Sequence, residues 1–124
     1  MTPAVDLKVT ILPDLFPDAK IFAYRIPENY QKLETLPIIK VEGVNEINES
    51  YGSDQYGARS YRVQVMAFLD IEETDIEGFN DVLDRGLEAK GYTLAYADDR
   101  PHNQYENVQV ITRQYNVVKI KERG

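Results

Sequence analysis

The sequence predicts an α+β domain, with an antiparallel or mixed sheet of about five strands and two helices packed on one face. Three observations predict it. Residues 61–70 alternate like a long strand, and residues 74–91 repeat like an amphipathic helix. The other apolar segments are strand-like and joined by short connections, which favours strands grouped in one sheet over alternating βα units.

The long strand belongs to the middle of the sheet. One set of alternating residues is apolar throughout and is expected to face the core: Tyr61, Val63, Val65, Ala67 and Leu69. The other set changes along the strand, from Arg62 and Gln64 to Met66 and Phe68. A strand whose far end is apolar on both faces is expected to be covered on both faces there.

The helix after this strand has its own start and stop signals. Thr74 is the expected N-cap, and Glu77 completes a capping box with it. Gly91 is the expected C-cap. Gly86 would allow close packing on the sheet, whereas the pattern gives no reason for Gly78. The apolar stripe consists of Ile76, Phe79, Val82, Leu83 and Leu87.

The remaining elements are shorter. A first helix is expected near Pro3–Leu15, with Pro13 ending its pattern because proline lacks a backbone donor. Asp98–Gln104 is expected to form a turn. The last strand changes the parity of its apolar residues near Ile111–Gln114, which predicts a bulge. Strands are expected at residues 20–26, 36–44, 92–97 and 105–121.

A polar segment at residues 45–58 separates the early strands from the central one. It lacks a sustained apolar period, so it is expected to be a flexible loop or hairpin tip. Two interpretations stay open for its tyrosines, Tyr51 and Tyr56. They are incidental residues of a mobile tip, or they anchor a segment that orders against a partner. Residues 1–124 form one domain, with a charged tail at 120–124 that frays.

Composition excludes several classes of function. The chain has 124 residues, a formal net charge of −7 and a pI near 4.7, so it lacks the basic footprint of a nucleic-acid-binding protein. It has no cysteine, and therefore no disulfide or thiolate site. No apolar run reaches the length of a membrane span, and no secretory signal is recognisable. No cofactor motif is present: Gly52 and Gly57 do not form a phosphate cradle.

The residues considered for metal binding or catalysis lie close together in one segment of the sequence. Asp98, Asp99, His102 and Glu106 could form an oxygen-rich metal site, but their spacing matches no calcium loop. The alternative is a charged turn between strands, with His102 as a solvated turn residue. No nucleophile motif accompanies them, so we expect no catalytic residue and no bound metal.

The order of elements resembles a family of bacteriophage proteins. RSYRVQVMAFLD, the helix TDIEGFNDVLDRGLEAKGY, a tyrosine-rich strand, the DDRP turn and a long last strand together resemble tail terminator, or tail-completion, proteins of long-tailed phages. The resemblance implies a non-enzymatic virion tail protein, made in the bacterial cytoplasm. It implies a ring of six copies that caps the tail tube and meets the head connector protein, without membrane or specific nucleic-acid binding.

The resemblance also gives hypothetical roles to three residues. Tyr51, Tyr56 and Arg59 would contact the tail tube protein or a neighbouring subunit, and the acidic surface would suit a lumen through which DNA passes. Two alternatives stay open. One is a small metal-dependent nuclease that uses Asp98, Asp99 and Glu106, and the other is an α+β adaptor or ligand-binding module.

Overall fold

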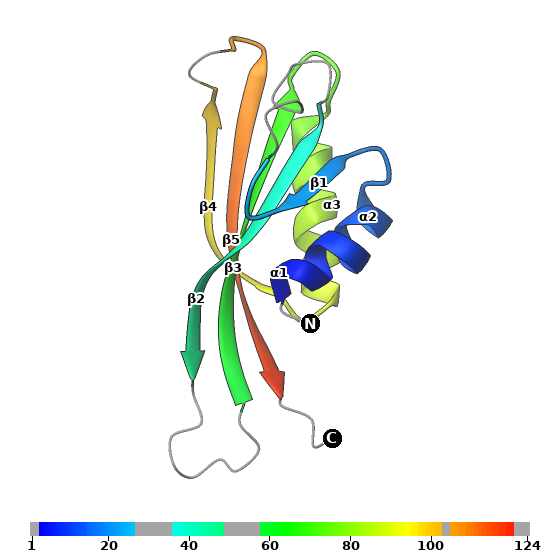
Figure 1. The fold of residues 1–124 in the computed structure, drawn as a ribbon. Coiled ribbons are helices and arrows are strands. Elements are labelled where there is room, and N and C mark those ends of the chain that lie inside the picture. The colour runs from blue at the N-terminus through cyan, green and yellow to red at the C-terminus, as the bar shows by residue number, and fades with distance from the viewer. Residues whose placement is uncertain (1–2, 27–35, 49–57, 103–104, 121–124) are drawn as a thin grey trace.

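Five strands form one mixed sheet in the computed structural model, which describes residues 3–26, 36–48, 58–102 and 105–120 (Figure 1). The strand order is β1-β2-β3-β5-β4. β1 is parallel to β2, and the other neighbours are antiparallel. This confirms the predicted fold class. The strands are β1 Lys20–Ala23, β2 Ile38–Asn48, β3 Ala58–Asp70, β4 Thr93–Pro101 and β5 Val108–Ile120.

β3 lies in the middle of the sheet, as its sequence pattern predicted. The residues expected to face the core are buried, except for Tyr61, which is half-buried. β3 and β5 pair without interruption from Ala58↔Ile120 to Asp70↔Val108. The bulge predicted near Ile111–Gln114 is therefore wrong. The sheet has irregularities elsewhere, at Val44 in β2 and at Ala95 in β4, where one residue is inserted into the ladder.

The N-terminal helix runs from Pro3 to Leu15 in three parts: α1 Pro3–Asp6, a π-helical turn η1 Leu7–Ile11, and α2 Leu12–Leu15. Pro13 does not end it. The π turn lies directly before this proline, and the wider turn accommodates a residue that lacks a donor and crowds the preceding turn. The backbone N–H of Leu12 bonds to the carbonyl of Leu7, five residues back.

α3 spans Ile76–Ala89 and packs its apolar stripe on the sheet through Phe79, Leu83 and Leu87. The predicted capping box is wrong. The N-cap is Asp75 rather than Thr74, and it makes no side-chain capping bond. Val82 does not belong to the buried stripe, because its side chain is 43% exposed.

Both helical glycines lie under other side chains. A Cβ on Gly86 would stand 2.5 Å from Leu15 Cδ1, so this glycine admits the N-terminal helix rather than the sheet. A Cβ on Gly78 would stand 2.6 Å from Oδ2 of Asp75. The two helices also meet through Phe16 and Phe79, whose stacked rings have centroids 4.5 Å apart.

Several boundaries differ from the sequence prediction. β1 ends at Ala23 rather than at residue 26, because Tyr24 has a φ of +70°, outside the extended region. β2 continues to Asn48 and β3 begins at Ala58, so residues 45–48 and 58 of the predicted loop belong to strands, and residues 49–57 lie outside the described residues. Asp98–Pro101 belong to β4 rather than to a turn.

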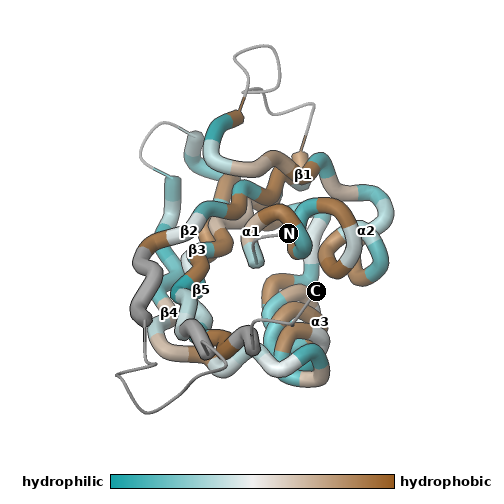
Figure 2. Tube along the Cα trace, turned by 60° about the horizontal axis from the view of Figure 1, so that its bottom comes forward, coloured by the Kyte–Doolittle hydropathy of each residue, from teal (hydrophilic) through white to brown (hydrophobic). Residues whose placement is uncertain are grey.

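All the described helices lie on one face of the sheet (Figure 2). The core fills the space between them, with fully buried residues from the N-terminal helix, the central strands and α3. The opposite side, called the open face below, carries the other parity of each strand. Figure 1 shows that β2, β3 and β5 extend below the helices.

Candidate interaction surface

The acids predicted to form a metal site do not converge. Asp98 and Asp99 are neighbours in β4, and neighbouring strand residues point to opposite faces of the sheet. On the open face, Asp98 Oδ2 lies 2.5 Å from Nε of Arg100. On the helix face, Asp99 Oδ1 lies 2.6 Å from a terminal nitrogen of Arg113. Among the described residues no group of three acids or histidines could hold a metal ion, so this geometry does not support the nuclease hypothesis.

His102 lies where β4 ends. Its ring centroid is 6.1 Å from that of Phe68 and 5.1 Å from that of Tyr105, and Nδ1 accepts a hydrogen bond from the Tyr105 N–H at 3.3 Å. The backbone N–H of His102 donates to the carbonyl of Val108 at 2.8 Å. The residue is half-buried and shapes the connection between β4 and β5.

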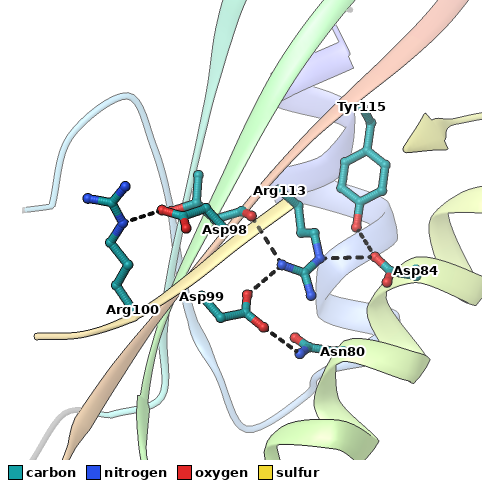
Figure 3. Close-up of polar contacts among 8 residues, drawn as sticks. Asn80, Asp84, Asp98, Asp99, Arg100, Arg113 and Tyr115 are labelled. Atoms are coloured by element: carbon teal, nitrogen blue, oxygen red, sulfur yellow. Dashed lines mark hydrogen bonds and ion pairs between the residues drawn. The ribbon is translucent and has the colours of Figure 1, made fainter. Parts of the chain in front are cut away.

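A buried arginine ties α3 to the two neighbouring strands (Figure 3). Arg113 comes from the helix face of β5, and its side chain is 6% exposed. It bonds Asp99 of β4 and lies 3.5 Å, Nε to Oδ1, from Asp84 of α3. Tyr115 donates to the same Asp84 oxygen at 2.6 Å, and Asn80 donates to Asp99 at 3.3 Å.

Electrostatics keeps this network charged. Burial by itself would lower the pKa of Arg113, but the hydrogen bond that Arg113 donates to Asp99 and the charges of Asp99 and Asp84 outweigh it and raise the pKa. Burial and the hydrogen bond to Asp84 raise the pKa of the Tyr115 hydroxyl. The network therefore holds β4 against α3 and fixes the position of this outer strand.

The network around Arg113 was not predicted, although the sequence contains a signal for it. Arg113 has the same parity as Ile111, Tyr115 and Val117, so it occupies a core-facing position of β5. A charge at such a position requires buried acidic partners. The change in parity of the apolar residues near Ile111–Gln114 was attributed to a bulge. With that interpretation Arg113 does not occupy a core position, and no buried acidic partners are expected.

A row of polar side chains crosses the open face. Gln114 Nε2 donates to Gln64 Oε1 at 2.9 Å, and Gln64 Nε2 donates to Glu42 Oε1 at 3.3 Å. One step further along, Arg62 Nε donates to Asn116 Oδ1 at 2.9 Å. Because the described helices leave this face uncovered, the row is available to a partner. It provides hydrogen-bonding groups rather than a reactive centre.

β4 is one of the two outermost strands of the described sheet, and it is exposed on both faces except for the half-buried Asp98. Leu94 is 44% exposed and Tyr96 is 47% exposed. Only one side of β4 pairs within the described part of the chain, with β5. Its other side presents backbone donors and acceptors, which is the arrangement that accepts a further strand.

A second exposed region lies at the far end of the sheet. We call it the arm: Val44–Asn48 of β2, Ala58–Arg62 of β3 and Asn116–Ile120 of β5. β1 pairs with β2 only as far as Val41, and β4 pairs with β5 only as far as Asn116, so the arm has three strands in the described residues. Val44 is 40% exposed and Val118 is 55% exposed.

One of the three predicted contact residues lies in the arm. Arg59 lies in β3, where its backbone pairs with Asn48 and Lys119, so it belongs to the arm. Tyr51 and Tyr56 lie outside the described residues. Their proposed contacts stay a prediction.

Comparison with known proteins places the fold. No family model matches the chain, and no curated protein matches it either. Among solved structures, a chain of the virion of a native gene transfer agent particle is similar, with a TM-score of 0.52 and 10% sequence identity. The match covers 96% of this chain and 92% of that one. At this identity the likeness shows a shared fold. No helix in the described residues is long and apolar enough to cross a membrane.

Proposed function

We propose that this chain is a structural component of a phage-like virion, and that it acts as a tail terminator or tail-completion protein. The observation that carries the proposal is the likeness in fold, over nearly the full length of both chains, to a chain of a gene transfer agent virion. The element order of a tail terminator, to which the sequence bears a resemblance, supports the same assignment.

The surfaces support assembly rather than catalysis. Asp98 and Asp99, two of the acids of the nuclease hypothesis, are engaged by arginines, and the exposed features are a free strand edge, an arm and an uncovered sheet face. A protein that acts by packing against copies of itself uses such surfaces. In this proposal the chain forms a ring, of six copies by analogy with the family, that caps the tail tube and meets the head connector protein.

Tyr51, Tyr56 and Arg59 have a place in this proposal as contacts to the tube or to a neighbouring subunit. Tyrosine is a frequent anchor at protein interfaces because it combines a large apolar ring with a polar tip. Combined substitution of Tyr51→Ala and Tyr56→Ala should weaken assembly onto tubes and leave the unfolding midpoint of the isolated protein unchanged. Loss of folding would assign these tyrosines to the structure of the subunit instead.

Electron microscopy of particles made without this gene tests the function. A terminator stops tube growth and prepares the joint to the head, so particles without it should have overlong tails or tails without heads. Normal tails of normal length, joined to heads, would contradict the proposal. Restoring the gene on a plasmid provides the control.

A further inference from the structure

We propose that the arm of one subunit docks along the free edge of β4 in the next subunit, head to tail around the ring. This inference rests on the proposed function, because it requires a ring. It names the two surfaces that would join the copies and identifies the occupant of the free edge as a second copy of this chain.

The edge of β4 is ready to accept a strand. Its outer backbone groups have no partner in the described residues, and Leu94 and Tyr96 present exposed apolar surface beside them. Charged side chains usually protect such an edge. Here Asp98 is paired with Arg100, and Asp99 with Arg113, so both carboxylates are neutralised within the subunit.

The arm has the complementary properties. It projects beyond the helices, and its outer strand, β2, has no strand partner on its outer side past Val41 in the described residues. Val44 is the inserted residue of the β2 bulge and lies exposed at the base of this free segment. Bulges are frequent at sheet edges, where they redirect a side chain. In the proposed contact Val44 meets the apolar surface of Tyr96.

Charge favours this pairing of surfaces. The arm segments contain three basic residues, Arg59, Arg62 and Lys119, and one acid, Glu46, in a chain of net charge −7. α3, which lies beside β4, contains four acids and one arginine. By composition, the arm segments are therefore basic in an acidic chain, whereas α3 beside β4 is acidic. Opposite charges on the two surfaces favour contact between them over contact between two arms or two β4 edges.

The proposed contact joins two different surfaces of the subunit, so it is heterologous. Pairing of β4 with β4 of another copy would be isologous and would end at a dimer. Pairing of the arm with β4 leaves one free arm and one free edge at every stage. Such heterologous contacts continue until the rotation closes a ring.

Cross-linking tests the contact directly, because the chain has no cysteine of its own. The double variant Val44→Cys/Tyr96→Cys is treated with a short bis-maleimide, at a protein concentration or with tail tubes that support assembly. We expect a ladder of cross-linked species on a denaturing gel, ending at the ring. Each single variant should stay monomeric, and a mixture of the two single variants should give dimers. The matched control is the variant Val9→Cys/Tyr96→Cys. Its first cysteine is also at an exposed valine, since Val9 is 57% exposed, but it lies on the N-terminal helix rather than in the arm.

The outcomes separate this inference from the function on which it rests. Dimers of Tyr96→Cys alone would show β4 paired with β4 and would overturn the head-to-tail contact. A ring found by mass measurement without cross-linking of the double variant would overturn the inference and leave the tail function standing. A chain that stays monomeric under all these conditions, including with tail tubes, would overturn both.

Discussion

Arg113 is the residue on which the packing of the outer strand depends. Replacing it by Met keeps much of its volume but leaves Asp84 and Asp99 without their cation. Breaking a buried ion pair typically costs about 3–5 kcal/mol. Asp84 and Asp99 are about one-third exposed, so we expect a smaller loss, about 2 kcal/mol, in the free energy of unfolding by urea.

Arg62→Met provides the matched control for this measurement. Within the described part of the chain Arg62 donates a hydrogen bond to Asn116 on the uncovered face, and a single half-buried bond contributes about 1 kcal/mol or less. Equal losses for the two variants would contradict the structural role assigned to Arg113.

Arg113 also explains one limit of sequence-based prediction. Alternation identified the core face of β3 correctly, because that face is apolar throughout. On β5 the core face contains one arginine, which interrupts the alternation of apolar residues. The apolar residues therefore change parity in the sequence, although β5 pairs with β3 without interruption. The partners that make this charge acceptable are distant in sequence, and only the folded structure brings them together.

Tyr92 carries a hydroxyl that is buried and makes no hydrogen bond within the described structure. Burial and the nearby charge of Asp6 raise its pKa to about 12. A buried polar group without a partner costs free energy, so Tyr92→Phe should leave stability at neutral pH unchanged or raise it by up to about 1 kcal/mol. Urea unfolding measures this. Tyr115→Phe is the contrast, because it removes a hydrogen bond to Asp84 and should lower stability by about 1.5 kcal/mol.

The same tyrosine predicts an alkaline limit to stability. Unfolded tyrosine loses its proton near pH 10, whereas folded Tyr92 keeps it to about pH 12. Between pH 10 and pH 12 the folded state binds more protons than the unfolded state. The contribution of Tyr92 to stability is therefore complete below pH 10 and is lost as the pH rises through 12. Tyr92→Phe should reduce this fall in the unfolding free energy between pH 9 and pH 12. An unchanged slope would contradict the assignment.

At the scale of elements, the contact of α3 with α2 makes a prediction about two glycines. Glycine in a helix costs about 1 kcal/mol relative to alanine, so both Gly78→Ala and Gly86→Ala gain helix propensity. At Gly78 the new methyl meets the exposed Asp75 side chain, which is free of a capping bond and can rotate away. At Gly86 the new methyl meets the side chain of Leu15, which is packed against the core.

We therefore expect the two substitutions to differ in sign. Gly78→Ala should stabilise the protein by about 0.5 kcal/mol, whereas Gly86→Ala should destabilise it by about 1 kcal/mol, since overpacking outweighs propensity. In a Leu15→Ala background the methyl at Gly86 has room, and Gly86→Ala should become stabilising. A double-mutant cycle with no coupling between the two positions would contradict the packing described for them.

Elements were predicted to the extent that local pattern determines them. The central strand and α3 have long, strong periods, and both were found. The ends depend on backbone geometry that the pattern does not contain, such as the positive φ of Tyr24 and the π turn before Pro13. The DDRP segment was predicted as a turn from its composition, yet pairing with β5 extends it as a strand.

At the scale of the whole molecule, the sequence predicted one sheet with helices on one face, but it did not predict which strands are outermost. Leu94 and Tyr96 alternate as residues of a buried strand do. In the sheet, the insertion at Ala95 shifts the register between them, and both are exposed on the outer strand. Edges are set by strand order, which depends on contacts distant in sequence, so the candidate surface could not be located from the sequence.

The free edges predict a pattern of amide exchange. Within the described sheet β3 has strand partners on both sides, whereas β4 has a partner on one side, so in the monomer the outward-facing amides of β4 should exchange fast and those of β3 slowly. When the ring forms, the proposed contact pairs β4 with the arm of the next copy. Hydrogen–deuterium exchange should then slow in Thr93–Pro101 and in Val44–Asn48, and should stay unchanged around Leu83 of α3, whose amides are bonded within the helix. Slow exchange of all β4 amides already in the monomer would mean that the edge is covered within the subunit. The ring would then have to use the uncovered sheet face, where the row of Glu42, Gln64 and Gln114 is available to a neighbour.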